Sequence, residues 1–347
     1  MGVSIIDIAK LAGVSKSTVS AVINNHPNVR TSTRERVMDA VRQLDYHPNI
    51  AARELITASP MNIGIIMPTY NVSTANKCDK YFSGIDEGSN LELVSQLIEK
   101  ISQTKYGALV EHVPISDTES ALPSFALSRR VSGIIQISPL LSSAYTQKLR
   151  EYVPTVVEIG ALNPDCDSVY TDFVEIGRLS VDYLVRSGHK KIAFINCDPA
   201  SRTVNSRLKG YLSGLKTCGM EYKENWVQNS SFNGSGGYNA FSAIWNSGEE
   251  KPTAVICASS VIAGGALRFM YENGIRVPCD VSVVTNGDSI LSEFVTPSLT
   301  AICRDKKEIA NAAFSLLFER LDNPSLPTRA IKTVNHIIER NSVKIRG

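Results

Sequence analysis

The sequence predicts a small all-α head followed by a larger α/β core. Three short helical patterns, each with recognisable start and stop residues, fill the first 47 residues. After residue 60, short apolar runs alternate with amphipathic segments, which is typical of βαβ units built on parallel sheets. The length of 347 residues is also sufficient for two or three domains.

The composition excludes several classes of protein. Hydrophobic residues make up 43% of the chain and charged residues 20%, which is typical of a globular protein and too apolar for a disordered one. No run reaches the roughly 18 apolar residues of a membrane helix, and the first residues do not resemble an export signal. The seven cysteines are dispersed without a Cys-x-x-Cys pair, which favours free thiols in a reducing cytoplasm.

The small excess of positive charge lies at the beginning of the chain. Residues 1–60 contain seven basic and five acidic side chains, which accounts for the whole net charge of +2. The remaining 29 basic and 29 acidic side chains cancel. An excess of this size is only weak support for an anionic partner such as nucleic acid.

The first two helical patterns are joined by a very short turn. Ser4 and Asp7 have the spacing of a capping box, and the helix that follows has one apolar face, made of Ile5, Ile8, Ala9 and Ala12. Gly13 is expected to end this helix, and Ser15 to cap the next one after a turn of three residues. In the second helix the inward positions are Val19, Val22 and Ile23.

The third helix is expected to begin at a capping box of Ser32 and Glu35 and to end before Pro48. Its predicted inner face is Val37, Ala40, Val41 and Leu44. Two helices joined by a three-residue turn that contains glycine form a helix-turn-helix, and the second helix carries few large residues outward, so it fits a DNA major groove. Spacing alone also allows the edge of an unrelated helical bundle.

The particular residues favour a DNA-binding helix-turn-helix over the edge of an unrelated helical bundle. The segments IIDIAKLAGVSKSTVSAVIN and TRERVMDAVRQLDYHPNIAARELI resemble the LacI/GalR (lactose-repressor) family of bacterial transcriptional regulators. The matching positions are Ala9, Ala12 to Ser15, Thr18 to Ser20, Asn24, Thr33, Arg34, Tyr46, Pro48, Asn49, Ala52, Arg53 and Leu55. The resemblance implies a helix-turn-helix DNA-binding domain at residues 1–47 and a hinge helix with a linker at residues 48–60.

The resemblance also assigns roles on DNA. It implies base-edge contacts from Lys16, Ser17 and Ala21, and phosphate contacts from Thr18, Ser20 and Asn24. Many relatives carry Arg at the position of Ala21, so a bidentate guanine reader is missing here and a different operator preference is expected. Simple helix capping is the alternative role for the serine and threonine residues.

Residues 49–56, NIAARELI, are too few to form a stable helix alone in water. In the family this segment is a hinge helix that becomes ordered on DNA beside its counterpart from the second subunit. The resemblance therefore implies minor-groove contacts from Asn49, Ala52, Arg53 and Leu55, with Leu55 as an apolar wedge at the operator centre. Without the surrounding motif, Leu55 would be interpreted as an ordinary core residue.

The rest of the chain is predicted to contain buried parallel strands. Six apolar runs support this: IGIIM (63–67), SGIIQIS (132–138), TVVEIG (155–160), KIAFIN (191–196), TAVICA (253–258) and VSVVTN (281–286). The segments between them predict a doubly wound architecture, in which ligands bind at the carboxyl ends of strands. No glycine-rich nucleotide motif follows a strand, so no nucleotide cofactor is expected.

The family resemblance extends through this region, from RRVSGII through TDFVEIGRLSVDYLVRSGHKKIAFI to TPSLTAI and IIERNSV. It implies an α/β two-lobed core of the type I periplasmic-binding-protein kind, with three crossovers and an effector cleft between the lobes. The expected DNA-proximal lobe comprises residues 61–160 plus 292–321. The expected distal lobe comprises residues 161–291 plus 322–342.

In that cleft the resemblance assigns effector binding to Arg207 and, by stacking, to Phe232, for which a core position is the alternative. A guanidinium can donate two hydrogen bonds to a hydroxyl pair, a carboxylate or a phosphate. The acidic partners of sugar-binding relatives are missing, because Ser260 stands at the position of an aspartate and Asn286, with Asp288 two residues on, replaces a Gly-Tyr-Asp sequence. Glu158 is the acid nearest the end of its strand. The expected effector-binding residues are therefore seven: Arg207, Phe232, Ser260, Asn286, Asp288, Glu158 and Tyr70.

These departures leave three interpretations of the cleft. A serine hydroxyl accepts hydrogen bonds more weakly than a carboxylate and carries no charge, so binding of a neutral sugar is in doubt. The effector is then an anion such as a sugar phosphate or a sugar acid, or a different set of residues binds it, or no effector is required.

The stretch of residues 68–90 is a second departure. Between Ile63 and Gly107 the chain is longer than in relatives by about 15–20 residues. Because this stretch leaves a strand at its carboxyl end, we expect it at the mouth of the cleft, where Tyr70 and Asn71 could line or cap the pocket. A solvated surface insertion is the alternative.

Taken together, the sequence predicts a cytoplasmic, nucleoid-associated homodimeric regulator, a repressor, that binds a pseudo-palindromic DNA operator and responds to a small-molecule effector. The chain ends without a heptad pattern, which favours a dimer over a tetramer. A solute-binding protein with the same core is the alternative, although it would need an export signal. No catalytic residue, cofactor, metal site or membrane contact is predicted, because the five histidines are isolated and His47 and His189 have structural settings.

Overall fold

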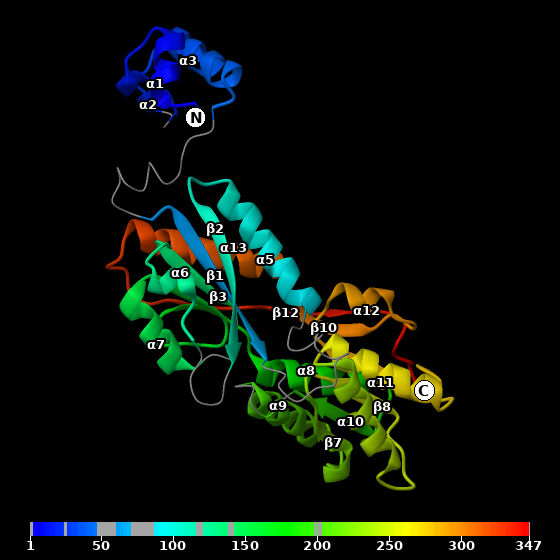
Figure 1. Cartoon of the computed structure of the whole chain (residues 1–347). Coiled ribbons are helices and arrows are strands. Elements are labelled where there is room, and N and C mark those ends of the chain that lie inside the picture. The colour runs from blue at the N-terminus through cyan, green and yellow to red at the C-terminus, as the bar shows by residue number, and fades with distance from the viewer. Residues whose placement is uncertain are drawn as a thin grey trace. The chain divides into compact units, whose positions relative to one another are not determined.

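The computed structural model describes residues 3–23, 26–46, 60–70, 87–115, 121–137, 142–197, 199 and 203–346, with only the backbone at 68–70, 87–89, 114 and 115. The chain forms two compact units, Met1–Ser59 and Pro60–Gly347 (Figure 1). Within the described residues no helix is both long enough and apolar enough to cross a membrane.

Three helices are described in the head: α1 (Ile5–Ala12), α2 (Lys16–Ile23) and α3 (Thr31–Gln43). The predicted capping box of α1 is confirmed, because both the amide and the hydroxyl of Ser4 donate to Asp7 Oδ2, at 2.9 and 2.6 Å. These hydrogen bonds lower the pKa of Asp7. Gly13 ends α1 in the left-handed conformation, at φ 63°, and the Thr18 amide donates to Ser15 Oγ at 3.1 Å.

A small core holds the head together. Three side chains, one from each helix, are fully buried: Ile8, Val19 and Val37. The predicted capping box of Ser32 and Glu35 is wrong, because α3 begins at Thr31 and no side chain caps it. The turn before α3 is stabilised instead by Arg34, whose guanidinium donates to the His26 carbonyl at 2.6 Å.

The core is built on two six-stranded sheets. Sheet A has the order β11-β5-β4-β3-β1-β2, and sheet B has the order β12-β10-β9-β8-β6-β7. All pairs are parallel except β10 with β12. The strands of sheet A are β1 (Asn62–Tyr70), β2 (Gly107–Ile115), β3 (Gly133–Ile137), β4 (Val156–Gly160), β5 (Asp167–Tyr170) and β11 (Ala330–Lys332). Those of sheet B are β6 (Ile192–Asn196), β7 (Val227–Asn229), β8 (Ala254–Cys257), β9 (Ser282–Asn286), β10 (Thr300–Arg304) and β12 (Asn335–Ile338).

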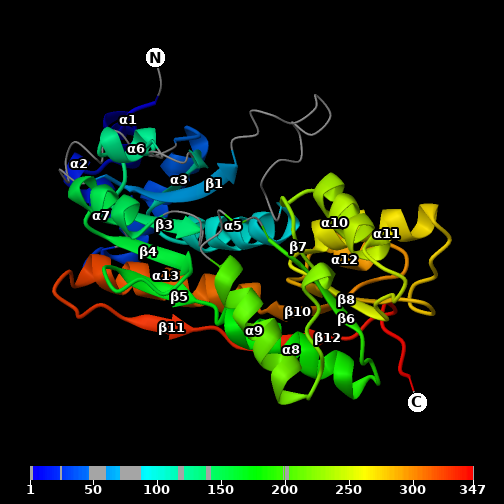
Figure 2. The ribbon, with the colours of Figure 1, turned by 90° about the horizontal axis from the view of Figure 1, so that it is seen from below.

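Helices cover both faces of each sheet (Figures 1 and 2). On sheet A, α5 (Glu87–Ser102) and α13 (Lys306–Asp322) pack on one face, and α6 (Ser124–Leu127) and α7 (Ser143–Tyr152) on the other. On sheet B, α8 (Phe173–Arg186) and α9 (Val204–Thr217) oppose α10 (Gly234–Asn246) and α11 (Ser260–Glu272). Two short helices are also described, η2 (Glu224–Trp226) and α12 (Ile290–Phe294). The predicted fold class is confirmed, as are all six predicted strands.

The boundaries between the lobes differ from those expected. Strands β5 and β11 belong to sheet A and β10 to sheet B, whereas the expected ranges placed each of them in the other lobe. The chain stays in sheet A through β5 because this strand pairs with β4, with Gly160 opposite Tyr170. The crossovers therefore lie at residues 171–172, at residue 305 and at residues 333–334.

Polar side chains tie these three crossovers to one another. Arg304 donates to Thr171 Oγ1 at 2.8 Å, and the hydroxyl oxygens of Thr171 and Thr333 are 3.2 Å apart. Lys332 donates to Asp172 Oδ2 at 3.0 Å, and Asp172 also caps α8. The connection between the lobes is thus a set of hydrogen-bonded segments placed side by side.

Helices α8 and α9 approach each other so closely that glycine is required between them. A Cβ atom on Gly210 would lie 2.2 Å from the carbonyl oxygen of Val174, so the two helices would have to separate. We expect Gly210→Ala to lower the free energy of unfolding of the core by about 3 kcal/mol. Urea titration would measure this loss, with Gly248→Ala as the control, because nothing lies within 4 Å of that site. Equal stability of the two variants would contradict the packing described here.

A buried histidine predicts a specific response to acid. His189 is fully buried, with Nδ1 3.0 Å from Thr253 Oγ1 and Nε2 3.2 Å from the Lys344 carbonyl oxygen. Burial, with a smaller contribution from Arg346, lowers its pKa from 6.5 to about 4. The imidazole of His189 is therefore protonated below about pH 6.5 in the unfolded chain but only below about pH 4 in the folded chain. Stability should fall over that interval as the pH is lowered, by at most about 1.4 kcal/mol per pH unit.

NMR titration of the ring protons of His189 would test this prediction directly. A midpoint near pH 4 is expected, and a midpoint near the ordinary value of 6.5 would contradict it.

Candidate DNA-binding surface and effector site

Helix α2 presents a small, polar face to solvent. Lys16 and Ser17 are exposed and Ala21 is half-buried, whereas Val19 and Val22 point into the core of the head. An outward face of this kind permits the backbone of the helix to approach base edges closely. The three predicted base-reading residues therefore share one helix, and their assignment to DNA stays a prediction.

The hydroxyl groups at the start of α2 are linked to its cap. Ser15 Oγ lies 2.7 Å from Ser17 Oγ and 2.8 Å from Thr18 Oγ1. Thr18 and Ser20 are both half-buried. The predicted cap of α2 by Ser15 is thus confirmed, because Ser15 Oγ accepts from the Thr18 amide. A phosphate contact by the Thr18 hydroxyl would compete with its hydrogen bond to Ser15.

Several predicted residues lie outside the described part of the chain. These are Asn24 of the head, the hinge residues Asn49, Ala52, Arg53 and Leu55, and Asn71 of the expected insertion. Tyr70 is described only as the last backbone position of β1. Their roles stay predictions.

Arg207 lies on the buried side of α9, with 8% of its surface exposed. Its guanidinium carbon is 4.4 Å from the ring centroid of Phe173, the first residue of α8, which is a cation–π contact. Nε donates to Thr203 Oγ1 at 3.3 Å and a terminal nitrogen to the Ala258 carbonyl at 3.5 Å. The side chain is thus held in one orientation by α8, by the start of α9 and by the end of β8.

The polar residues at the ends of β8 and β9 are buried as well. Ser260 Oγ lies 2.7 Å from Ser289 Oγ, and Asn286 donates from Nδ2 to Ser180 Oγ at 2.7 Å. The Oδ1 atom of Asn286 and the Oγ1 atom of Thr285 are buried and have no hydrogen-bond partner among the described residues. Buried polar atoms without partners are rare, and at the carboxyl end of a strand they mark a place where a ligand could bind.

The two acidic candidates, Asp288 and Glu158, both interact with other side chains of the protein. Asp288 forms a bidentate ion pair with Arg340, with two oxygen–nitrogen distances of 2.9 Å. Glu158 is fully buried in sheet A and accepts a hydrogen bond from Asn163 at 2.7 Å. Phe232 is half-buried and packs on the apolar core between sheet B and α10 and α11. The structure thus places Arg207 at the carboxyl end of β8, next to Ala258. It does not gather all seven candidate effector-binding residues into one described pocket.

Sequence reasoning did not identify the residues that surround these candidates. Phe173, Thr203 and Ala258 hold Arg207, Ser289 holds Ser260, and Arg340 holds Asp288. Most of these partners are far away in the sequence, so no motif points to them. Thr203 alone carried a local signal, because it precedes Arg207 by one helical turn.

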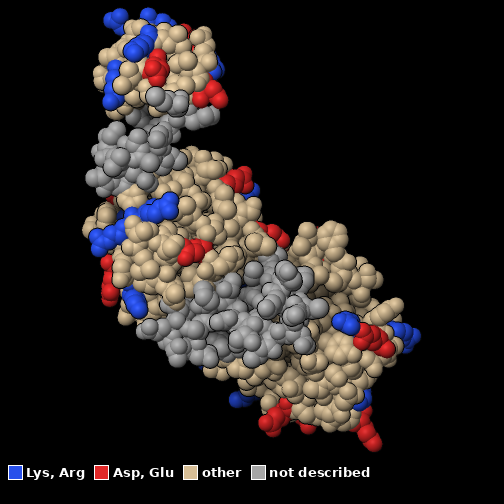
Figure 3. Space-filling view, in the orientation of Figure 1, with Lys and Arg blue, Asp and Glu red and all other residues tan. Residues whose placement is uncertain are grey.

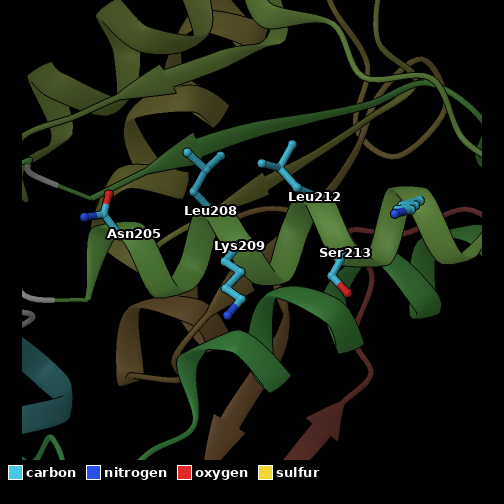
Figure 4. Close-up of a pocket in the computed structure, with 6 residues that line it drawn as sticks. Asn205, Leu208, Lys209, Leu212 and Ser213 are labelled. Carbon is cyan, nitrogen blue, oxygen red and sulfur yellow. The ribbon is translucent and has the colours of Figure 1, made fainter.

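Hollows lined by described residues include one cavity and one groove of similar volume. A cavity of about 420 Å³ lies where α5 meets the crossover region, and it is lined by residues that include Glu92, Gln96, Asp288, Arg304 and His336. A shallow groove of about 410 Å³ runs along the outer side of α9, where Leu208 and Leu212 point to one side and Lys209 and Ser213 to the other (Figure 4). Arg207 lines neither of them. Among the described residues, no group of three or more His, Cys, Asp and Glu side chains could hold a metal ion.

Comparison with known proteins agrees with this architecture. Residues 4–49 match the sequence profile of "Bacterial regulatory proteins, lacI family", and residues 181–343 match that of "Periplasmic binding protein-like domain". A DNA-reading head attached to a ligand-binding core defines the class of ligand-responsive DNA-binding regulators. The profile of the core matches strands of both sheets, from residue 181 within α8 to residue 343.

Relatives and solved structures match over nearly the whole chain. The HTH-type transcriptional repressor PurR of Mannheimia succiniciproducens is 30% identical over 97% of this chain and 98% of its own, and PurR of Klebsiella pneumoniae is also 30% identical, over 97% and 96%. The lac repressor dimer bound to operator and the anti-inducer ONPF has a TM-score of 0.77 and 24% identity, over 99% of this chain and 100% of that one. The CelR–cellobiose complex has a TM-score of 0.68 and 24% identity, over 98% and 99%.

At this identity and coverage the chain belongs to the lacI family of bacterial regulatory proteins. It is a DNA-binding transcriptional repressor with an effector-binding core, and not an enzyme. The alternative of a solute-binding protein is wrong, because residues 4–49 match the DNA-binding profile of the family.

Proposed function

We propose that the protein represses transcription as a homodimer on a pseudo-palindromic operator and that an anionic, sugar-derived effector controls it. Each subunit places α2 in a major groove, where Lys16, Ser17 and Ala21 face base edges. The two hinge segments meet in the central minor groove, where Leu55 inserts between base pairs. A protein that acts on chromosomal operators works in the bacterial cytoplasm.

The proposal of an anionic effector is carried by the contrast between Arg207 and the acidic candidates. Arg207 is a buried guanidinium at the carboxyl end of β8, where ligands of parallel sheets bind. Asp288 is occupied by Arg340, Glu158 accepts from Asn163, and Ser260 carries no charge. A neutral sugar needs carboxylates that accept from its hydroxyl groups, whereas a phosphate or a carboxylate needs donors.

Regulation is proposed to act through the crossovers. An effector between the lobes shifts the population of closed and open arrangements, and the hydrogen-bonded crossovers around Thr171, Arg304 and Thr333 absorb the rotation. The sheet A lobe, which follows the head in the sequence, then either favours or opposes the pairing of two hinge segments on DNA. The stretch of residues 68–90 begins within the last residues of β1 and ends within the first residues of α5, and we retain it as a candidate cap of the pocket.

The effector is tested by a screen that reports on DNA. Operator DNA is first selected from random duplexes with the purified protein. Sugar phosphates, sugar acids and the matching neutral sugars are then compared for their effect on the affinity for that operator. We expect a response to at least one anion and none to its neutral counterpart, and a response confined to neutral sugars would overturn the assignment of ligand class.

The homodimer is proposed to use an apolar face that includes α12. Ile290 and Phe294 lie one turn apart on this helix and expose 60% and 74% of their surfaces. Leu91 of α5, a helix that contacts α12, is 53% exposed. A second copy of the chain is the occupant that the lac repressor dimer suggests for such a face.

We expect Phe294→Asp to weaken dimerisation by at least a hundredfold. Burying a phenylalanine side chain contributes about 1.5–3 kcal/mol, and a symmetric dimer loses two copies. Sedimentation equilibrium would measure the change, with Tyr222→Asp as the control at a 47% exposed aromatic on the loop after α9. Unchanged dimerisation of Phe294→Asp would reject α12 as part of the interface.

A further inference from the structure

Three basic side chains surround the point at which the core begins. Lys105 precedes β2, and Arg129 and Arg130 precede β3; all three are exposed. Strands β2 and β3 are the two neighbours of β1, so these residues flank the start of β1 from both sides. We call Lys105, Arg129 and Arg130 the basic collar. Figure 3 shows basic side chains gathered on the sheet A lobe in the region where β1 begins in Figure 1.

Hydrogen bonds fix the collar segments to the first residues of the core. Asn62 Nδ2 donates to the Arg130 carbonyl at 3.2 Å, and the Ser132 amide donates to the Asn62 carbonyl at 2.8 Å. The hydroxyl of Ser132 donates to the carbonyl of Pro60. On the other side the Gly107 amide, two residues beyond Lys105, donates to the Met61 carbonyl at 2.9 Å. The collar is therefore tied to residues 60–62 by backbone and short side chains, while its own charged ends point to solvent.

The turn that carries the two arginines is rigid. The amides of Arg129 and Arg130 donate to the carbonyls of Ala126 and Phe125 at 3.0 and 2.8 Å. Arg129 has a φ of 51°, a left-handed conformation that residues with a Cβ seldom adopt. Strained positions of this kind persist where the surrounding structure enforces them, and they are concentrated at functional sites.

The charges of the collar are not balanced locally. None of its three side chains forms an ion pair with another described residue. The ammonium group of Lys105 lies over the ring of Tyr106, at 5.4 Å from its centroid. Glu111, the acid that contacts this region, accepts hydrogen bonds from the amide and hydroxyl of Ser124 at 2.8 Å. Three exposed cations that form no ion pair within the described part of the chain attract a polyanion.

We propose that the basic collar contacts the phosphate backbone of operator DNA, which gives the core its own share in DNA binding. This inference rests on the proposed function, in which Leu55 lies in the minor groove. The five residues from there to Pro60 can span at most about 17 Å. The minor groove is only about 7.5 Å deep, so the phosphates on its rims lie within the reach of the collar's long side chains.

Salt dependence of operator binding tests the collar. The variant K105Q/R129Q/R130Q is compared with K190Q/K209Q/K216Q, which removes three exposed lysine charges from the sheet B lobe. Each phosphate contact contributes about 0.9 to the slope of log affinity against log salt, and every residue occurs twice in the dimer. We expect the collar variant to bind operator at least tenfold more weakly at 100 mM salt and to lose about 2–5 from that slope. The control variant should change affinity by less than threefold.

Each possible result decides between this inference and its alternatives. A loss of affinity with an unchanged slope would mean that the collar acts on the protein's own linker and not on DNA phosphates. Equal losses of affinity in both variants would mean a general effect of net charge. Either result overturns the inference. If the unaltered protein itself shows no preference for any duplex, the proposed function fails instead. Should the triple variant unfold at a lower temperature than the control, the single substitution Lys105→Gln tests the slope alone, with an expected loss of about 1.8.

Phosphate ethylation interference provides a second measurement. Ethyl groups on the phosphates that flank the operator centre should weaken binding by the unaltered protein but not by the collar variant. Interference that is identical for the two proteins would also overturn the inference.

Discussion

Replacing Val19 by aspartate is expected to weaken operator binding by at least a thousandfold while the core stays folded. Val19 is fully buried between the three helices of the head, and no described cation lies in that core to pair with a carboxylate. An unpaired carboxylate costs several kcal/mol in such a site. A head of fewer than 60 residues has only a few kcal/mol of stability to lose, so it should unfold.

The matched control is Met38→Asp, which introduces the same charge at a position on α3 that is 39% exposed. Fluorescence anisotropy with labelled operator would measure affinity, and thermal unfolding followed by circular dichroism would report on the core. Operator binding by Val19→Asp within tenfold of Met38→Asp would contradict a DNA-reading role for the head. Loss of the unfolding transition of the core would contradict the division into two units.

Replacing Arg207 by alanine is expected to reduce the response to the effector by at least a hundredfold without changing operator affinity in the absence of effector. Each hydrogen bond from a charged group to a ligand contributes about 1.5–3 kcal/mol, and a guanidinium can form two to one anion. Arg207 lies in the core, and its described contacts are Phe173, Thr203 and Ala258 of the same lobe.

Two further variants separate binding from folding. Arg207→Lys keeps the charge but not the planar group that stacks on Phe173, so it should restore stability better than it restores the response. Arg178→Ala, on the exposed side of α8, removes an arginine from the same lobe and should leave the response intact. The measured quantity is the concentration of the active sugar phosphate or sugar acid that produces half of the maximal change in operator affinity. A normal value for Arg207→Ala would remove this residue from the site.

Much of the fold could be predicted because its signals are local. The capping box of Ser4 and Asp7, the stop at Gly13 and the six apolar runs each lie within a few consecutive residues, and each is present as expected. The exception in the head is also local: Arg30 rather than Ser32 precedes α3, since the backbone carbonyl of Arg30 already accepts from the Thr33 and Arg34 amides.

The boundaries of the lobes could not be predicted for the opposite reason. Strand β10 is buried, and its residues look alike whether the strand joins sheet A or sheet B. Strand β11 has three exposed residues and no apolar run, so it gives no signal at all. The sheet to which a strand belongs is decided by pairing with strands that are distant in the sequence, such as Ala330 of β11 opposite Ser168 of β5.

The candidate effector site shows the same limit. Arg207 could be found because it lies in a recognisable segment, but its stacking on Phe173 depends on how α8 packs on α9. The sequence suggests Asp288 as a ligand-binding acid, yet Arg340, which is distant in sequence, forms a bidentate ion pair with it. Whether a carboxylate is available to a ligand therefore depends on partners that only the folded structure reveals.

The central claim is that residues 1–59 read DNA sequence under the control of the core. Its most direct test is the ratio of affinities for a selected operator and for random duplex DNA of equal length, measured with the purified full-length protein at physiological salt. We predict a ratio of at least about a thousand, as specific DNA-binding proteins show. A ratio near one, in the presence and absence of the sugar phosphates and sugar acids of the screen, would contradict the claim.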